Sequence, residues 1–139
     1  MRFLKELAAT SAFLSNHEDV LEFSIVGSAC VVDKPKDLDI LVLVNAKSFI
    51  NVARWMFGSE WDLCGDEYDD QDDKWGALRN GNVNLIVTVD RAWFTRGKLA
   101  NEVCTALKLT DKGDRIVAHR VIRDGYSAEA ANQRRNGAA

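Results

Sequence analysis

The residues of this 139-residue chain best suited to chemistry are two aspartates, Asp37 and Asp39, which are separated by one leucine. An apolar run that ends in Gly27-Ser28 precedes them, and a second apolar run over 40–44 follows. On a strand, side chains two residues apart point to the same face, so both carboxylates face one way. Paired carboxylates can hold divalent cations, and a Gly-Ser turn can hold phosphates on its backbone N–H groups. The pattern therefore predicts a site for a metal-bound nucleoside triphosphate.

The elements that must position these residues lie in the first third of the chain. Apolar residues at helical spacing predict a helix over roughly 2–15, and a strand over 20–26 follows it. A short irregular or helical connection, closed by the single proline, Pro35, leads to a second strand over 38–44. The continuous apolar run of this second strand is typical of a strand that is covered on both faces.

The rest of the chain indicates a helix, a hairpin and two further helices. A helix is expected over 46–57, and an acidic stretch over 66–73 follows it. Strand-like runs flank Asn80-Gly81, a dipeptide that predicts an antiparallel hairpin with a type I′ turn. Beyond Asp90 a helix is expected with one apolar stripe, formed by Leu99, Val103, Ala106 and Leu107. A last helix follows and contains Ile116, Val117, His119, Arg120 and Val121. Asp111 is its expected N-cap, and Gly125 is expected to end it. Together these elements predict an α+β domain whose small mixed β-sheet of about four strands is packed with helices.

Composition sets the class of protein. One domain is expected over residues 1–126, and the small, polar residues 127–139 are expected to form a flexible C-terminal tail. No apolar run is long enough to cross a membrane, and the charged N-terminal residues differ from a signal peptide. Three widely spaced cysteines suit a reducing compartment, so we expect a cytoplasmic protein. The net charge of −3 argues against a dedicated nucleic-acid-binding surface, but not against a nucleotide whose charge is met by Mg²⁺.

The order of these features resembles the DNA polymerase β-type nucleotidyltransferase superfamily. The shared pattern is an apolar strand, Gly-Ser, a short connection and Asp-apolar-Asp-apolar; it covers residues 23–44 and, by element order, extends to about Val89. Minimal nucleotidyltransferases, the antitoxins that pair with HEPN toxins and antibiotic nucleotidyltransferases belong to this superfamily. The chain as a whole resembles a small phage-encoded member of this superfamily.

The resemblance implies a metal-dependent transfer of an NMP unit from an NTP to an acceptor hydroxyl, with Mg²⁺ or Mn²⁺ as cofactor. Gly27 and Ser28 would contact the triphosphate, Ser28 through its hydroxyl and backbone N–H. Asp37 and Asp39 would be the catalytic, metal-binding residues, with one ion on the triphosphate and one shared with the acceptor. The metals would stabilise the attacking and leaving oxygens of an in-line attack on the α-phosphorus. The acceptor, whether protein, small molecule or RNA, is left open.

Two departures from the superfamily pattern matter. The connection between Ser28 and Asp37 is a couple of residues shorter than in most members, which predicts a stunted phosphate-binding helix. Active members usually carry a third carboxylate on a later strand, and the equivalent position here is Asn84. An amide can lend a carbonyl oxygen to a metal or a nucleotide, but it cannot act as a base. Asp90 lies six residues further along that strand, roughly 20 Å away at about 3.3 Å per residue, which is too far to replace it.

Other polar and aromatic residues have both a functional and an ordinary interpretation. The acidic stretch is either a solvated loop or a surface for a basic partner, and its Asp72 or Asp73 could approach the site. Three cations beyond the sheet could reach a triphosphate or simply face solvent: Lys98, Lys112 and Arg115. The histidines (His17, His119), the tryptophans (Trp55, Trp61, Trp75, Trp93) and Cys104 are interpreted as ordinary helix or packing residues.

Two functions of different class follow from the sequence. The first is a metal-dependent nucleotidyltransferase that uses Asp37 and Asp39. The second is a catalytically degenerate relative that binds a nucleotide or a protein partner, for example a phage factor acting on a host protein; Asn84 and the acidic stretch favour it. A third, weaker interpretation is an antitoxin-like transferase that modifies a protein hydroxyl.

Overall fold

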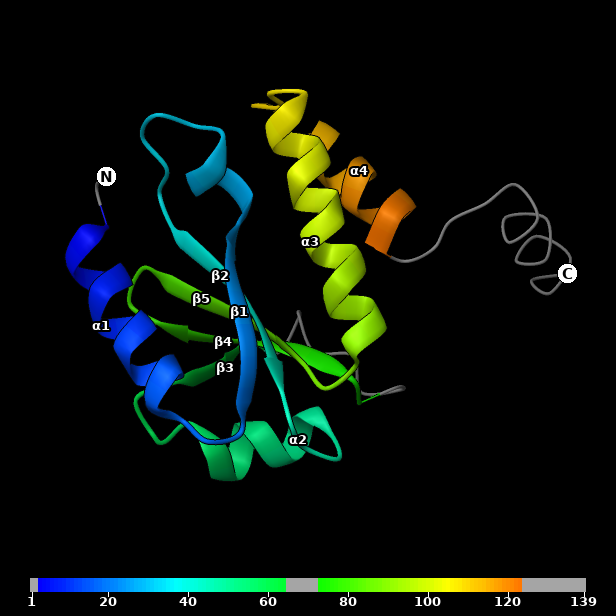
Figure 1. Ribbon diagram of the computed structural model, residues 1–139. Coiled ribbons are helices and arrows are strands. Elements are labelled where there is room, and N and C mark those ends of the chain that lie inside the picture. Colours follow the sequence, from blue (N-terminus) through cyan, green and yellow to red (C-terminus); the bar gives the residue numbers. More distant parts are fainter. Residues whose placement is uncertain (1–2, 65–72, 124–139) are drawn as a thin grey trace, which may run out of the picture.

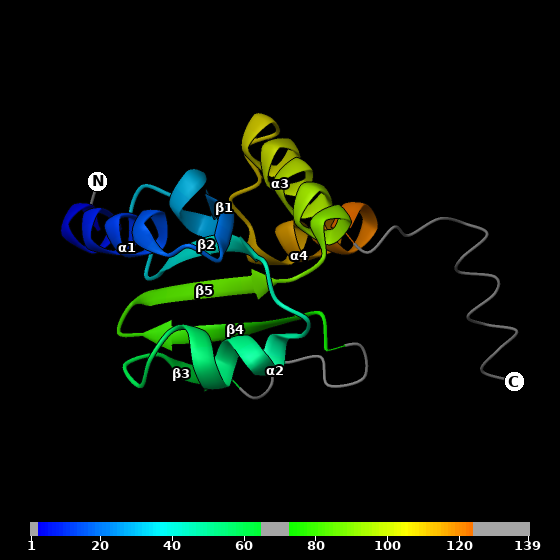
Figure 2. The same cartoon turned by 60° about the horizontal axis from the view of Figure 1, so that its bottom comes forward.

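The computed structural model describes residues 3–64 and 73–123, which form a mixed β-sheet with helices against both of its faces (Figures 1 and 2). In chain order, the elements are α1 (Leu4–Asn16), β1 (Val20–Val26), η1 (Gly27–Cys30), β2 (Leu38–Val44), α2 (Phe49–Asn51), η2 (Val52–Met56), β3 (Asp62–Cys64), β4 (Trp75–Asn80), β5 (Val83–Thr88), α3 (Arg91–Ala106) and α4 (Lys112–Arg123). The predicted bounds of the first two strands are confirmed.

The sheet has the strand order β1-β2-β5-β4-β3. The central pair, β2 and β5, is parallel, and the other neighbouring pairs are antiparallel. This confirms the predicted α+β class and its mixed sheet. A fifth strand, β3, joins the edge next to β4 and is three residues long, too short for a clear alternation in the sequence.

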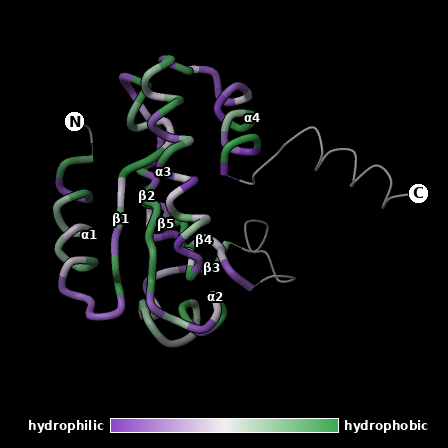
Figure 3. Tube along the Cα trace, turned by 45° about the vertical axis from the view of Figure 1, so that its right-hand side comes forward, coloured by the Kyte–Doolittle hydropathy of each residue, from purple (hydrophilic) through white to green (hydrophobic). Residues whose placement is uncertain are grey.

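The two faces of β2 are buried against different helices, as its continuous apolar run predicts. Alternate residues from Leu38 to Val44 join a core with α1, α2 and η2. The intervening Leu41 and Leu43 join a second core with Trp93 and Phe94 of α3. The hydrophobic run along β2 is visible in Figure 3. Asp39 belongs to this second set of positions, so its side chain emerges on the face that carries α3 and α4.

Helix α3 lies close to the sheet, and α4 packs on α3. A Cβ at Gly97 would lie 2.9 Å from Leu41 Cδ2, so a larger residue there would push the helix away. The buried side of α3 carries mainly small and aromatic residues: Trp93, Phe94, Gly97, Ala100 and Cys104. No helix of the described residues is long and apolar enough to cross a membrane.

Three local predictions differ from the structure. The hairpin loop consists of Gly81 and Asn82, because Asn80 pairs with Val83. Of these two, Gly81 alone has positive φ, which is the type II′ pattern rather than type I′. The expected apolar stripe of α3 is wrong, since Leu99 and Leu107 are 50% and 65% exposed. The helix expected over 46–57 begins later, at Phe49, and ends as a π-helical turn.

Candidate active site

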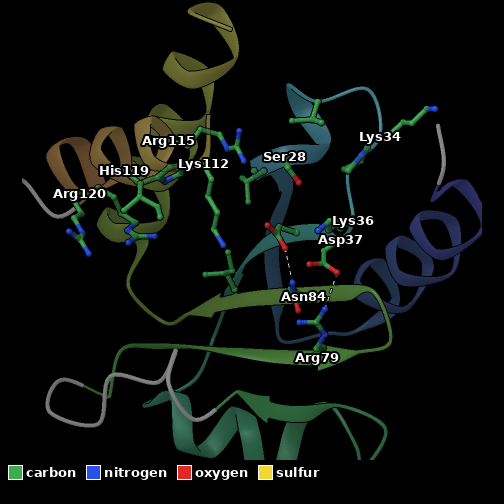
Figure 4. Close-up of a pocket in the computed structure, with 18 residues that line it drawn as sticks. Ser28, Lys34, Lys36, Asp37, Arg79, Asn84, Lys112, Arg115, His119 and Arg120 are labelled. Atoms are coloured by element: carbon green, nitrogen blue, oxygen red, sulfur yellow. Dashed lines mark hydrogen bonds and ion pairs between the residues drawn. The ribbon is translucent and has the colours of Figure 1, made fainter. Parts of the chain in front are cut away.

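A cavity of about 830 Å³ lies on the α4 side of the sheet (Figure 4). Its walls come from η1 and the connection to β2, from the first residues of β2 with β4 and β5, and from one side of α4. The residues that line it are Val26, Gly27, Ser28, Val32, Lys34, Pro35, Lys36, Asp37, Asp39, Arg79, Asn84, Ile86, Lys112, Arg115, Ile116, His119, Arg120 and Arg123. All of the predicted site residues are therefore brought together in one cavity.

Three polar residues on adjacent strands form a row across the floor of the cavity. Asp39 of β2 is the register partner of Asn84 of β5, and Asn84 is in turn the partner of Arg79 of β4. The Asn84 amide nitrogen donates a hydrogen bond to Asp39 Oδ1 at 2.9 Å. The Asn84 side chain therefore lies beside Asp39 on the floor of the cavity, on the strand that neighbours β2.

Asp37 immediately precedes β2 and pairs with a cation that the sequence analysis did not single out. Arg79 Nη2 lies 2.9 Å from Asp37 Oδ1, and Arg79 Nε donates to the Gly81 carbonyl at 3.0 Å. The pair is partly exposed, with side-chain accessibilities of 45% for Arg79 and 36% for Asp37. Solvent screens such a pair, so its net contribution to stability is small.

The electrostatics of Asp39 are dominated by its burial. Burial raises the pKa of the Asp39 carboxyl, and the neighbouring Asp37 charge raises it further. The hydrogen bond from Asn84 and the charges of Arg79 and Lys112 act in the opposite direction without cancelling the effect. The ionised carboxylate is therefore held at a cost to the fold, which a bound cation would relieve.

Gly27 is required beside Asp39 for two separate reasons. Its φ is +75°, a conformation that residues with a Cβ rarely adopt. A Cβ built on Gly27 would also lie 2.7 Å from Asp39 Oδ2. The Gly-Ser pair therefore lets the chain turn directly over the second carboxylate, which explains why the two motifs belong to one site.

Asn101 of α3 fixes this turn, and the sequence analysis missed it. Its Oδ1 accepts a hydrogen bond from the Gly27 N–H at 3.0 Å, and its Nδ2 donates to the Ile25 carbonyl at 3.4 Å. The Gly27 N–H is thus already bonded, so any contact between Gly27 and a phosphate does not involve that group. The available signal was a polar residue adjoining the small, buried positions Gly97, Ala100 and Cys104 of α3.

The connection after Gly27 is short, as predicted. Residues 27–30 form the four-residue 3₁₀ turn η1, in which the Ser28 carbonyl accepts from the N–H groups of Val31 and Val32 at 3.1 and 2.8 Å. The Ser28 side chain lines the cavity (Figure 4). Ser28 is therefore placed to meet a ligand, but without a long helix behind it.

The cavity is strongly cationic although the whole chain carries a net charge of −3. Seven lysine and arginine side chains line it, against the two aspartates. Four of them come from α4: Lys112, Arg115, Arg120 and Arg123. These positions, with Ile116 and His119, recur at helical spacing and lie on one side of α4. Of the cations predicted to reach a triphosphate, Lys112 and Arg115 are in the cavity.

Other candidate residues have roles outside the cavity. Lys98 forms an ion pair with Glu22 at 2.8 Å. Asp90 is the N-cap of α3 and accepts hydrogen bonds from the N–H groups of residues 92 and 93. Asp73 accepts from the backbone at the start of α2, and Asp72 lies outside the described residues. His17 and Cys104 are packing residues, as expected: His17 contacts Phe13 and Phe57, and Cys104 is buried.

The chemistry of the donor set fits a divalent cation that is shared with a ligand. Oδ1 of Asp37 and Oδ1 of Asp39 have protein partners, whereas the described residues provide no hydrogen bond to either Oδ2. The Asn84 Oδ1 is buried and also has no hydrogen-bond partner among the described residues. No group of three His, Cys, Asp or Glu side chains suited to a metal occurs in that part of the chain. Two carboxylates suffice for Mg²⁺ when substrate phosphates supply further oxygens.

The comparisons with known proteins identify no family for this chain. No protein-family model and no curated protein matches the chain. Among solved structures, the chain is similar to the conserved protein GrpB from Enterococcus faecalis, with 18% identity and a TM-score of 0.49 over 90% of this chain and 92% of that one. At this level of likeness, the match does not bear on activity. Superfamily membership, phage origin and the cofactor stay predictions.

Proposed function

We propose that the cavity is a nucleotidyltransferase-type site, which binds an NTP with Mg²⁺ or Mn²⁺ and transfers its NMP unit to an acceptor hydroxyl. The observation that carries the proposal is that Asp37 and Asp39 lie in one cavity with seven cationic side chains, and that the described residues give neither Oδ2 a hydrogen bond. A carboxylate pair in a cationic cavity suits a ligand that brings both a metal and several phosphate groups. The cavity volume of about 830 Å³ is in the usual range for ligand sites.

Different residues of the cavity would bind different parts of the triphosphate. Ser28 offers its hydroxyl to a phosphate oxygen, and Lys112, whose charge acts on Asp39, supplies a cation beside the carboxylates. Asn101 keeps Gly27 turned over Asp39, so the carboxylate and the phosphate-binding residues stay in fixed relative positions. Such positioning supplies much of the catalysis in phosphoryl and nucleotidyl transfer.

Asp37 and Asp39 are the residues that would hold the metal. When bound, it would supply positive charge at the attacking and leaving oxygens. In the transfer, the acceptor oxygen forms a bond to the α-phosphorus, and the bond from that phosphorus to the α–β bridging oxygen breaks. Pyrophosphate leaves with the electron pair. Because the described residues place an amide rather than a third carboxylate beside Asp39, the hydroxyl proton passes to solvent water.

A specific observation favours a second candidate, a nucleotide-binding protein without turnover. Arg79 already neutralises Asp37, and Asn84 already occupies one oxygen of Asp39. A protein that has replaced one catalytic carboxylate by an amide could retain nucleotide binding and lose the transfer step.

The test compares binding with turnover in the same samples. Thermal stability is measured with each NTP, with and without Mg²⁺ or Mn²⁺, and pyrophosphate release is measured in parallel. A ligand at about 100 times its Kd stabilises by about 2.7 kcal/mol, which raises the Tm by several degrees. We expect a metal-dependent increase that is lost in Asp37→Ala/Asp39→Ala. The matched control is Glu18→Ala/Glu102→Ala, which removes two exposed carboxylates outside the cavity.

The outcomes separate the candidates. Metal-dependent stabilisation together with pyrophosphate release that disappears in Asp39→Ala supports the transferase. Stabilisation without release under any acceptor condition supports the binding protein, and Asn84→Asp should then restore metal affinity or turnover. Absence of stabilisation by every NTP and metal, in a folded protein, contradicts both.

A further inference from the structure

Six of the seven cationic side chains of the cavity fall into two groups from different elements, and the seventh, Arg79, is paired with Asp37. One group comes from α4 and includes Lys112 and Arg120. The other lies on the connection before β2 and consists of Lys34 and Lys36. Figure 4 shows the α4 residues on one side of Ser28 and the two connection lysines on the other. If the triphosphate of the proposed NTP binds beside Ser28 and Lys112, the second group, Lys34 and Lys36, is left without a ligand.

These side chains are not used by the fold. Within residues 3–64 and 73–123, the side chains of Lys34, Lys36, Lys112 and Arg120 make no hydrogen bond or ion pair, and all four residues are exposed. Arg115 differs, since its guanidinium donates to the carbonyls of Leu109 and Thr110 at 3.0 and 2.7 Å. The two lysines of the connection therefore remain available to a ligand.

The total charge also exceeds what one nucleotide needs. Seven cations against two carboxylates leave a surplus of five positive charges in the cavity. A triphosphate with about four negative charges and one Mg²⁺ brings a net charge of about −2. The remaining positive charge attracts a second anionic group and repels a cationic acceptor.

We infer that the acceptor is itself a phosphate monoester, a nucleotide 5′-phosphate that is either free or at the end of an oligonucleotide, and that Lys34 and Lys36 bind its phosphate. This inference rests on the proposed nucleotidyl transfer and names its acceptor class. The acceptor hydroxyl attacks the α-phosphorus, pyrophosphate leaves, and the phosphate of the acceptor is unchanged by the reaction.

The acceptor site is tested by binding, so that turnover is not needed. Calorimetry is performed on the full chain with Mg²⁺ and an NTP analogue that has a non-cleavable α–β bridge. The probes are a 5′-phosphorylated trinucleotide, the same trinucleotide with a 5′-hydroxyl, a nucleoside 5′-monophosphate and the free nucleoside. We expect a preference of at least tenfold for a phosphorylated probe over its hydroxyl counterpart, and a smaller preference at higher ionic strength.

The variant Lys34→Ala/Lys36→Ala should lose this preference while its affinity for the metal-bound NTP analogue changes by less than about twofold. The control Lys5→Ala/Lys47→Ala removes two exposed lysines outside the cavity and should behave like the wild type. The two probe pairs distinguish a free nucleotide from an oligonucleotide end. Equal affinity for phosphorylated and hydroxyl probes, with the NTP analogue bound, overturns the inference and leaves the proposed function intact. Failure of the NTP analogue to bind overturns the proposed function itself.

Discussion

Replacing Gly27 by alanine tests the central geometric claim, that the chain turns directly over the Asp39 carboxylate. The substitution adds a Cβ to a residue with φ of +75° and places that atom 2.7 Å from Asp39 Oδ2. Alanine in the left-handed region costs about 1–2 kcal/mol. Because the carboxylate must also move within a partly buried site, the overpacking adds about 1–3 kcal/mol. We therefore expect Gly27→Ala to lower the free energy of unfolding by about 2–5 kcal/mol.

The chain contains a matched control for the backbone term. Gly81 also has positive φ, at 58°, but a Cβ built on it has no atom within 4 Å. Gly81→Ala should therefore cost about 1–2 kcal/mol, without the overpacking term. Urea unfolding of both variants gives the excess cost at Gly27, and a thermal-shift titration with metal-bound NTP should show weaker binding in Gly27→Ala alone.

A double-mutant comparison assigns that excess to Asp39. In Asp39→Ala the oxygen is gone, and the remaining Asp39 Cβ lies 3.5 Å from the Cβ built on Gly27, which is ordinary contact. The cost of Gly27→Ala in this background should fall to that of Gly81→Ala. The reasoning is refuted if Gly27→Ala costs no more than Gly81→Ala, or if its excess cost is unchanged without the Asp39 carboxylate.

Four further predictions concern the groups around Asp39. Asp39→Asn should abolish metal-dependent nucleotide binding. It should nevertheless stabilise the fold at neutral pH by about 0.5–2 kcal/mol, because it removes a charge whose burial raises the pKa of the carboxyl. A Tm below that of the wild type would contradict this prediction. The folded state holds the Asp39 proton more tightly than the unfolded state does. The stability of the wild type should therefore fall as pH rises from the ordinary aspartate pKa through the raised one. Over the same pH window, the Tm of Asp39→Asn should rise relative to that of the wild type. Protons compete with the cation at Asp39, so Mn²⁺ affinity by calorimetry should increase across that window in the wild type, whereas a flat profile would place the metal elsewhere. Asn101→Ala should cost about 1–3 kcal/mol in urea unfolding, because it leaves the Gly27 N–H without its partner. Asn101→Asp keeps that acceptor but sets a carboxylate oxygen against the Ile25 carbonyl, so it should recover only part of the loss.

The sequence was sufficient for the strands that carry the candidate site. The two strands around the Gly-Ser and Asp-Leu-Asp motifs are bounded by Gly27 and Pro35, residues whose backbone preferences end a regular element. The continuous apolar run of the second strand predicted that it is covered on both faces, which the two cores confirm. The resemblance predicted that Asn84 of the later strand belongs to the same site, and the register places Asn84 level with Asp39.

The contacts that the sequence did not reveal depend on packing between distant elements. The Arg79–Asp37 pair requires the hairpin register, which a one-residue shift of the turn changes. The buried side of α3 was misjudged because large apolar residues were expected inward. Gly97 allows α3 to lie against Leu41, and Leu99 is left exposed. The basic side of α4 was present as a helical repeat, but its position over the sheet depends on how α4 packs on α3.

The arrangement of Asp39 explains why binding and stability should oppose each other in this protein. A fold selected for stability alone gains nothing from a carboxylate that is half-buried, held next to a second carboxylate and overlain by a glycine in a left-handed conformation. Asn84 donates a hydrogen bond to one oxygen of Asp39, and Arg79 donates one to an oxygen of Asp37. The described residues give neither Oδ2 atom a hydrogen bond, and under the proposed function a divalent cation would stabilise both carboxylates. Under the proposed function, a ligand that carries a metal ion and phosphate groups would meet the two carboxylates with the metal and the surplus lysine and arginine charge with the phosphates.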